Sequence, residues 1–205
     1  PGEVTLAHGG VLLLDEAPEF QTRVLESLRQ PLEEGEVRVS RIRETVTFPA
    51  RFHLVATANP CPCGFLGSDT QTCRCLPGEQ HRYRRRLSGP LIDRIDLAAW
   101  VDPVSPDTLL SAPAGESSAV VRERVEQVHR LRTERGWATE GPAQPSIETC
   151  LEMFGRPGRR ELKAALASRS RSGRSLQQLV RVACTIADLD GSEQVGVAQV
   201  QEGLL

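Results

Sequence analysis

GVLLLDEAPEF, residues 10–20, runs four consecutive apolar residues directly into two adjacent carboxylates. A short apolar run between glycines and acids is typical of a central strand covered on both faces, and we expect Val11–Leu14 to form one. Asp15 and Glu16 then follow at its carboxyl end, where two charges about 4 Å apart repel by on the order of 4 kcal/mol at an effective dielectric near 20. We therefore expect a cation nearby. The alternative is that both carboxylates are simply solvated where the strand surfaces.

Length, charge and hydropathy restrict the class of protein. The chain has 205 residues, enough for one large or two small domains, and its formal net charge of −2 gives no global basic excess that would indicate nucleic-acid binding. No apolar run approaches the roughly 18–20 residues that span a bilayer, and no signal peptide opens the chain. We expect a soluble, cytoplasmic protein with no membrane partner. The absence of an initiator Met predicts a fragment.

The first hundred residues mix predicted strands and helices. Apolar residues at helical spacing predict an amphipathic helix over 21–32. β-Branched residues around an arginine-bearing middle predict a hairpin over 37–48, and further apolar runs predict strands over 52–57 and 97–101. We interpret residues 1–102 as an α/β domain.

The composition changes after Pro103. Residues 103–118 are rich in Pro, Ser and Ala and predict a linker. Residues 119–205 carry apolar residues at helical spacing throughout and predict an all-helical domain. The stripes are Val121, Val125 and Val128; Leu162, Ala165 and Leu166; Leu176, Leu179, Val180, Ala183 and Ala187, with a C-cap at Asp190 and Gly191; and Val197, Val200 and Leu204.

Polar residues at the predicted strand ends point to a nucleotide site. An Asp at the carboxyl edge of such a sheet holds Mg²⁺, and a following Glu activates water for attack on the γ-phosphate. The stretch VATANP brings Asn59 to the matching edge of a neighbouring strand, where an amide positions the attacking water. In LSGPLIDRIDL, Arg94 stands between two aspartates. The alternative for Arg94 is a surface ion pair.

Four stretches, GVLLLDEAPEF, ATANPCPCG, SGPLIDRIDL and SGRSLQQLVRVACTIADLDG, in this order and spacing, resemble the magnesium-chelatase-like AAA+ ATPases of the ComM/YifB group. The resemblance covers nearly the whole chain. It implies an α/β fold class, with the C-terminal half of a AAA+ P-loop-type core sheet followed by an all-α lid domain. The site residues that it implies are a Walker B pair, Asp15 for Mg²⁺ and Glu16; a sensor 1 residue, Asn59; an arginine finger, Arg94; and a sensor 2 arginine, Arg174, with Arg171 as its competitor.

The resemblance also implies an activity. It predicts an ATP hydrolase that uses ATP with Mg²⁺, assembles as a hexameric homo-oligomer and moves branched DNA junctions in recombination and natural transformation. An arginine supplied across a subunit interface is worth roughly 10³–10⁵ in rate. No GxxxxGK[ST] loop occurs in the 205 residues, and the family pattern puts that loop upstream. We therefore expect this chain alone to bind ATP weakly or not at all and to be inactive.

Two other functions fit the same sequence. One is a magnesium-chelatase subunit that couples ATP hydrolysis to metal insertion into a porphyrin, although the CPCG and CRC pairs favour the ComM group. The other is a non-catalytic, zinc-stapled module that binds partners or DNA.

The pattern C-P-C-x₉-C-x-C offers four soft thiolates, which favours structural Zn²⁺ over disulfides in a chain without an export signal. These residues are Cys61, Cys63, Cys73 and Cys75. Their one-residue gaps are shorter than the usual C-x₂₋₄-C, so reduced, metal-free thiols are the alternative, and His81 is a substitute ligand. Four sulfur ligands leave no open position for catalysis. Cys150 and Cys184 are expected to be core residues.

Two basic clusters remain. Arg38, Arg41 and Arg43 crowd the predicted hairpin, and the resemblance implies that they contact DNA phosphates in a central pore, without sequence preference. The alternative is charge protection of an exposed strand edge. The second cluster, Arg82, Arg84, Arg85 and Arg86, contains a single aromatic residue, Tyr83, so it predicts a subunit boundary or a solvated helix face rather than a base-stacking platform.

Overall fold

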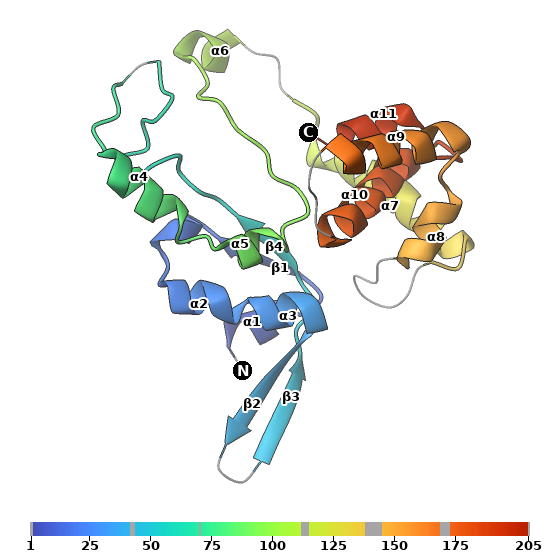
Figure 1. Cartoon of the computed structure of the whole chain (residues 1–205), viewed down its shortest axis with the longest axis horizontal. Helices are drawn as coiled ribbons and strands as arrows, with labels where there is room; N and C mark the ends of the chain where they lie inside the picture. Colours follow the sequence, from blue (N-terminus) through green and yellow to red (C-terminus); the bar gives the residue numbers. More distant parts are fainter. Residues whose placement is uncertain are drawn as a thin grey trace. The chain divides into compact units, whose positions relative to one another are not determined.

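The computed structural model describes residues 2–41, 44–69, 71–111, 115–137, 145–168 and 173–204. The chain divides into two compact units, Pro1–Pro103 and Val104–Leu205. Within the described ranges, no helix combines the length and apolar character that a membrane crossing requires. The elements, labelled in Figure 1 apart from η1, are α1 Glu3–Leu6, β1 Val11–Leu14, η1 Ala17–Glu19, α2 Thr22–Ser27, α3 Arg29–Glu34, β2 Glu36–Arg41, β3 Glu44–Pro49, β4 His53–Ala56, α4 Pro77–Arg84, α5 Gly89–Ile92, α6 Pro106–Ser111, α7 Ser118–Glu134, α8 Ile147–Glu152, α9 Arg156–Ser168, α10 Gly173–Leu189 and α11 Val197–Glu202.

The small sheet of the first unit pairs β1 with β4 in parallel, in register from Val11↔His53 to Leu14↔Ala56. Both strand predictions are confirmed. The described residues cover only one face of β1, because Val11 and Leu13 are each 61% exposed while Leu14 is buried. Coverage of its second face stays a prediction. Helices cover only one face of this sheet in the part of the chain that the structure describes.

The covered face forms the core of the first unit. The buried residues at its centre are Leu14, Ala17, Leu25, Leu28 and Leu91, and Leu12 and Leu54 of the strands pack against them. Full burial of one Leu stabilises a fold by about 1.5–3 kcal/mol. This cluster therefore fixes the carboxyl end of β1 and the following η1 against α2 and α5.

The single helix expected over 21–32 is two helices, α2 and α3, that meet at Leu28. Pro31 explains the break. It has no N–H to donate to the carbonyl of Ser27, and its ring clashes with that carbonyl. The chain leaves α3 through Gly35, whose φ of +67° is a left-handed conformation that glycine adopts without strain.

The predicted hairpin over 37–48 is confirmed. Strands β2 and β3 pair antiparallel from Glu36↔Pro49 to Arg41↔Glu44, and the amide of Ala50 donates to the carbonyl of Gly35 at 2.7 Å to close its base. Figure 1 shows the hairpin extending from the end of α3, away from β1 and β4.

The strand predicted over 97–101 is wrong. These residues have no strand structure, and Leu97, Trp100 and Val101 are 72%, 72% and 84% exposed. An isolated strand is not stable without a neighbour. Among the described residues no strand pairs with this segment.

The second unit packs its helices around one core. Its buried residues, carried mainly by α8, α9, α10 and α11, are Cys150, Met153, Phe154, Leu162, Ala165, Leu179, Val180, Ala183, Cys184, Ala187, Val195 and Val200. Cys150 and Cys184 are thus core residues, as predicted. Helix α10 ends before Gly191, whose φ is +67°, so the predicted C-cap is confirmed. Helix α6 lies within 103–118, and the interpretation of this stretch as a linker stays a prediction.

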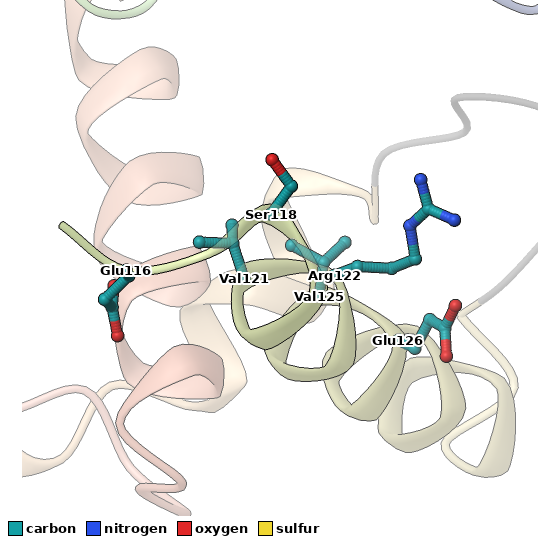
Figure 2. Close-up of a pocket in the computed structure, with 6 residues that line it drawn as sticks. All are labelled: Glu116, Ser118, Val121, Arg122, Val125 and Glu126. Carbon is teal, nitrogen blue, oxygen red and sulfur yellow. The ribbon is translucent and has the colours of Figure 1, made fainter. Parts of the chain in front are cut away.

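Helix α7 of the second unit departs from its predicted pattern of burial. Helix α7 is confirmed, but Val121 and Val125 of its apolar stripe are 42% and 43% exposed. Figure 2 shows them beside Arg122 in a shallow pocket that Glu116, Ser118 and Glu126 also line. All six lining residues come from α7 and the two residues before it, so no second element closes this pocket.

Candidate nucleotide and metal sites

Parallel pairing brings the ends of β1 and β4 to one edge of the small sheet. Two backbone hydrogen bonds extend the pairing beyond the strands, from Thr57 N–H to Leu14 O at 3.0 Å and from Ala17 N–H to Thr57 O at 2.8 Å. The predicted residues Asp15, Glu16 and Asn59 therefore meet here. We call these three residues and Thr57 the acidic edge.

Hydrogen bonds orient both carboxylates of the acidic edge. The Thr57 hydroxyl donates to Asp15 Oδ1 at 2.6 Å and accepts the Glu16 amide at 2.8 Å. Asn59 Nδ2 donates to Glu16 Oε1 at 3.3 Å. Glu16 has φ +51°, a left-handed conformation that costs a non-glycine residue free energy. The bond that its amide forms with Thr57 helps to hold this strained turn.

Thr57 is the member of the acidic edge that sequence reasoning missed. A threonine at the end of a β-strand is an ordinary strand residue by propensity. Its only signal is a hydroxyl two positions before Asn59, which is able to donate and accept at the same time.

The cation expected beside the acid pair is absent from the described residues, since neither Asp15 nor Glu16 forms an ion pair there. Both residues are exposed, so water screens their repulsion, and neutral donors take the place of an arginine. Oδ2 of Asp15 forms no hydrogen bond with any described residue. This edge thus keeps its negative charge and a free carboxylate oxygen, the kind of ligand that Mg²⁺ takes.

The structure holds Arg94 inside its own chain. Its side chain is only 9% exposed, and Nη2 lies 2.5 Å from Oε1 of Glu33. Nη1 donates to the carbonyl of Pro90. Nε is buried and donates to none of the described residues. The alternative of an ion pair is therefore present, between a largely buried Arg94 side chain and a Glu33 side chain that is 40% exposed. The role of Arg94 toward a neighbouring subunit stays a prediction.

Arg174 is the second residue of α10 and is partly exposed. It belongs to the second unit, whose placement relative to the acidic edge is not determined, so its sensor 2 role stays a prediction. Arg171, its competitor, lies outside the described residues.

The four cysteines between β4 and α4 converge. Every pair of Sγ atoms among Cys61, Cys63, Cys73 and Cys75 lies within 4.8 Å. The three distances that link Cys61, Cys63 and Cys73 are 3.4, 3.7 and 3.7 Å. In a tetrahedral site with Zn–S bonds of about 2.3 Å, sulfur atoms are about 3.8 Å apart. The one-residue gaps therefore do not prevent four-thiolate geometry. We call these residues the cysteine cluster.

Neighbouring groups lower the pKa of one thiol in the cysteine cluster and raise the pKa of another. Hydrogen bonds from the backbone of Phe65 and Arg74 lower the pKa of Cys63 to about 6. Burial, together with the hydrogen bond to Cys63, raises the pKa of Cys75 to about 12. One thiol of the cluster thus loses its proton readily, and the negative charge that results makes proton loss from the next thiol less favourable. A bound cation removes this electrostatic penalty.

Helix α4 begins directly after the cysteine cluster. Gln80 Nε2 donates to Cys73 Sγ at 3.7 Å and to Cys75 O at 3.2 Å. His81, the substitute ligand considered, is exposed and is not part of the cluster. Arg82, Arg84 and Arg85 are exposed, as expected for a solvated helix face, whereas Arg86 contacts η1.

The arginines of the hairpin are described only in part. Arg38 Nη2 lies 2.6 Å from Glu36 Oε1 and 3.7 Å from Glu34 Oε2, and the hydrogen bond and charge of Glu36 raise its pKa. Acidic neighbours thus offset its charge. For Arg41 only the backbone, in β2, is described, and Arg43 lies outside the described residues.

Two family models match this chain. Residues 1–109 match the model described as magnesium chelatase, subunit ChlI, and residues 115–205 match that of the C-terminal part of this subunit. Over its whole length the chain is 40% identical to the uncharacterised protein YifB of Escherichia coli (strain K12) and 41% identical to the competence protein ComM of Haemophilus influenzae. It is 38% identical to an uncharacterised protein of Mycobacterium tuberculosis (strain H37Rv). The chain spans 40%, 40% and 41% of the lengths of these three relatives.

Proposed function

The chain belongs to the magnesium chelatase family, subunit ChlI, and on this basis we propose that it carries the hydrolytic part of a AAA+ ATPase site. The convergence of Asp15, Glu16 and Asn59 on one edge of two parallel strands carries the proposal. Ligands of open α/β sheets bind beyond the carboxyl ends of the strands. The phosphate-binding loop then comes from a part of the protein outside these 205 residues.

Each residue of the acidic edge has a separate role in this proposal. Asp15 offers its free carboxylate oxygen to Mg²⁺, which supplies neutralisation of the charge on the triphosphate. Glu16 acts as the general base that accepts a proton from the attacking water. Asn59, already in contact with Glu16 at 3.3 Å, orients that water.

The site is completed by arginines in this proposal. Arg94 reaches the ATP of a neighbouring subunit in a hexameric ring, and Arg174 of the helical lid approaches the phosphates from the same chain. Arg94 must first leave Glu33, its 2.5 Å partner. Ring closure, which brings a triphosphate of higher charge to the interface, supplies a competing anion.

The proposed architecture is the C-terminal half of a AAA+ core over 1–102, a linker over 103–118 and an all-α lid over 119–205. Two observations support it. The chain spans about 40% of the length of its relatives, and the uncovered face of the small sheet exposes Val11, Leu13 and Val55 by 61%, 61% and 47%. An apolar sheet face of this kind is normally covered by further elements of the same domain.

The proposed work of the ATPase is DNA translocation and branch migration in recombination and natural transformation. The 41% identity to a protein named for competence supports this, as does a projecting hairpin that carries Arg38 and Arg41. Arg43, which lies outside the described residues, completes the proposed set of DNA-contacting arginines. Contacts of these side chains with DNA phosphates hold the strand without reading its sequence. The alternative role of these arginines, charge protection of an exposed strand edge, is supported by the ion pair between Glu36 and Arg38.

The cysteine cluster is proposed to hold a structural zinc ion. Its sulfur spacing supports four-thiolate ligation, and the low pKa of Cys63 supplies a first anionic ligand near neutral pH. Four protein ligands leave no coordination position for water, so the ion takes no part in hydrolysis.

Glu16→Gln in the complete protein that contains this chain tests the ATPase proposal. The change removes the base but keeps an oxygen for Asn59, so ATP turnover should fall about 100-fold or more, while the Kd for ATP stays unchanged. A coupled ATPase assay and titration with a fluorescent ATP analogue measure the two quantities. Glu3→Gln, an exposed acid of α1 in the same unit, is the matched control. Undiminished turnover in Glu16→Gln would refute the assignment.

A further inference from the structure

The cysteine cluster is joined through the chain to the acidic edge on one side and to helix α4 on the other. On one side, only Pro60 separates Asn59 from Cys61, whose side chain is fully buried. On the other side, Cys75 is followed at once by Leu76, the N-cap of α4. A metal ion bound by both Cys61 and Cys75 therefore ties the loop of Asn59 to the start of α4.

The first turns of α4 are connected to the cysteine cluster by hydrogen bonds. The backbone N–H of Leu76 donates to Glu79 Oε2 at 2.8 Å, which caps the helix. Gln80, one residue later, bonds both Cys73 Sγ and Cys75 O. The direction of α4 is thus set by groups that the cluster holds in place.

The other end of α4 returns to the acidic edge. Tyr83 of α4 is 4% exposed. Arg86, just beyond α4, donates from Nη1 to Pro18 O at 2.9 Å and to Glu19 Oε2 at 3.2 Å. Pro18 and Glu19 belong to η1, the turn whose N-cap is Glu16.

We infer that the metal-loaded cysteine cluster is a clamp that positions the acidic edge. The ion fixes the loop of Asn59 through Cys61 and Pro60, and it fixes α4, which holds the Glu16 turn through Arg86. This inference rests on the proposed zinc site and extends it, because the ion then controls the order of Glu16 and Asn59 without touching either residue. Arg86 is a positioning residue in this scheme.

Hydrogen–deuterium exchange of the 205-residue chain, with and without zinc, tests the clamp. Metal analysis of protein purified without chelator should find about one zinc per chain. Removal of zinc with a chelator under reducing conditions should speed amide exchange in residues 15–20 and 57–59 by about tenfold or more. The amides of the hairpin β2–β3 serve as the internal reference and should exchange at the same rate in both states.

A variant that keeps the metal tests the link between α4 and the Glu16 turn. Arg86→Ala should retain zinc and speed exchange only in residues 17–20. Arg84→Ala, an exposed arginine of α4, is the matched control.

The outcomes distinguish the clamp from the zinc site. A chain that binds zinc but shows unchanged exchange at both segments after its removal overturns the clamp and leaves the zinc site standing. A chain that binds no zinc overturns both. If removal of zinc unfolds the whole first unit, the Arg86→Ala variant decides, and unchanged exchange in residues 17–20 overturns the clamp.

Discussion

Asp15 in the first unit and Asp188 in the second are both held by hydrogen bonds, but they differ in whether a carboxylate oxygen remains without a partner among the described residues. The side chain of Asp188 is fully buried, and its two oxygens are taken at 2.7 Å by Arg132 Nε and Arg135 Nη1. Asp15 is exposed and has one neutral donor, Thr57, at 2.6 Å. A carboxylate saturated by arginines has no capacity for a ligand, whereas one with a free oxygen does.

The surroundings of the two carboxylates make the same distinction. Arg132 also donates to Thr185 Oγ1 at 3.0 Å, and the guanidinium of Arg135 lies 5.0 Å from the ring centre of Trp137. Asp188 thus joins α7 to α10. The Asp15 carboxylate contacts Thr57 at the two strand ends and is exposed. We expect substitutions at Asp188 to change stability, and those at Asp15 to change binding.

Asp188→Ala should have the largest effect on stability. It leaves two arginines without their buried partner, which typically costs about 3–5 kcal/mol. Both guanidinium groups retain some access to water, at 22% and 26% exposure, so the lower end of this range is expected. Urea unfolding followed by Trp137 fluorescence, in a Trp100→Phe background, measures the loss.

Asp190→Ala is the control for that substitution, since Asp190 is exposed and contacts only Gln199 at 3.0 Å among the described residues. Its expected cost is about 0.5 kcal/mol. Equal losses in Asp188→Ala and Asp190→Ala would contradict a structural role for the buried carboxylate.

Thr57→Val should have an intermediate effect. It keeps the shape of the side chain but removes the donor to Asp15 and the acceptor of the Glu16 amide, two exposed hydrogen bonds that together are worth about 1 kcal/mol. Exchange of the Glu16 amide should become faster, and ATP turnover of the complete protein should fall. NMR exchange measurements and the ATPase assay report these two changes.

Thr57→Ser restores the hydroxyl and should restore both quantities. If Thr57→Val leaves the Glu16 amide protected, a group other than Thr57 holds the left-handed turn. The comparison of Asp15 with Asp188 would then lose the Thr57 contact on which its Asp15 side depends.

The regions of the chain also differ in how much the sequence predicts. The apolar runs of β1 and β4, each followed by polar residues, are sufficient to predict the acidic edge, because parallel strand ends meet whatever covers the sheet. The convergence of the four cysteines follows from their proximity in the chain. These features depend on local pattern alone.

Features that depend on a partner in space are not predictable in this way. The pattern over 97–101 has apolar residues but contains no information about a neighbouring strand, and Val121 and Val125 have helical spacing without a surface to cover them. Pro31 did carry a local signal for the break between α2 and α3. The burial of Arg94 against Glu33 depends on the packing of α5, which residue spacing does not encode.

Asp15→Ala should have the smallest effect on stability, and it tests the difference between Asp15 and Asp188 most directly. It removes one hydrogen bond at an exposed position, so the free energy of unfolding should change by less than about 0.5 kcal/mol. Magnesium-dependent ATP binding by the complete protein should nevertheless be lost, because Asp15 offers a free carboxylate oxygen at the proposed site. Far-UV circular dichroism in urea and nucleotide titration with and without Mg²⁺ measure the two effects. A loss of stability comparable to that of Asp188→Ala would mean that both carboxylates are structural, and the nucleotide site would then lie elsewhere.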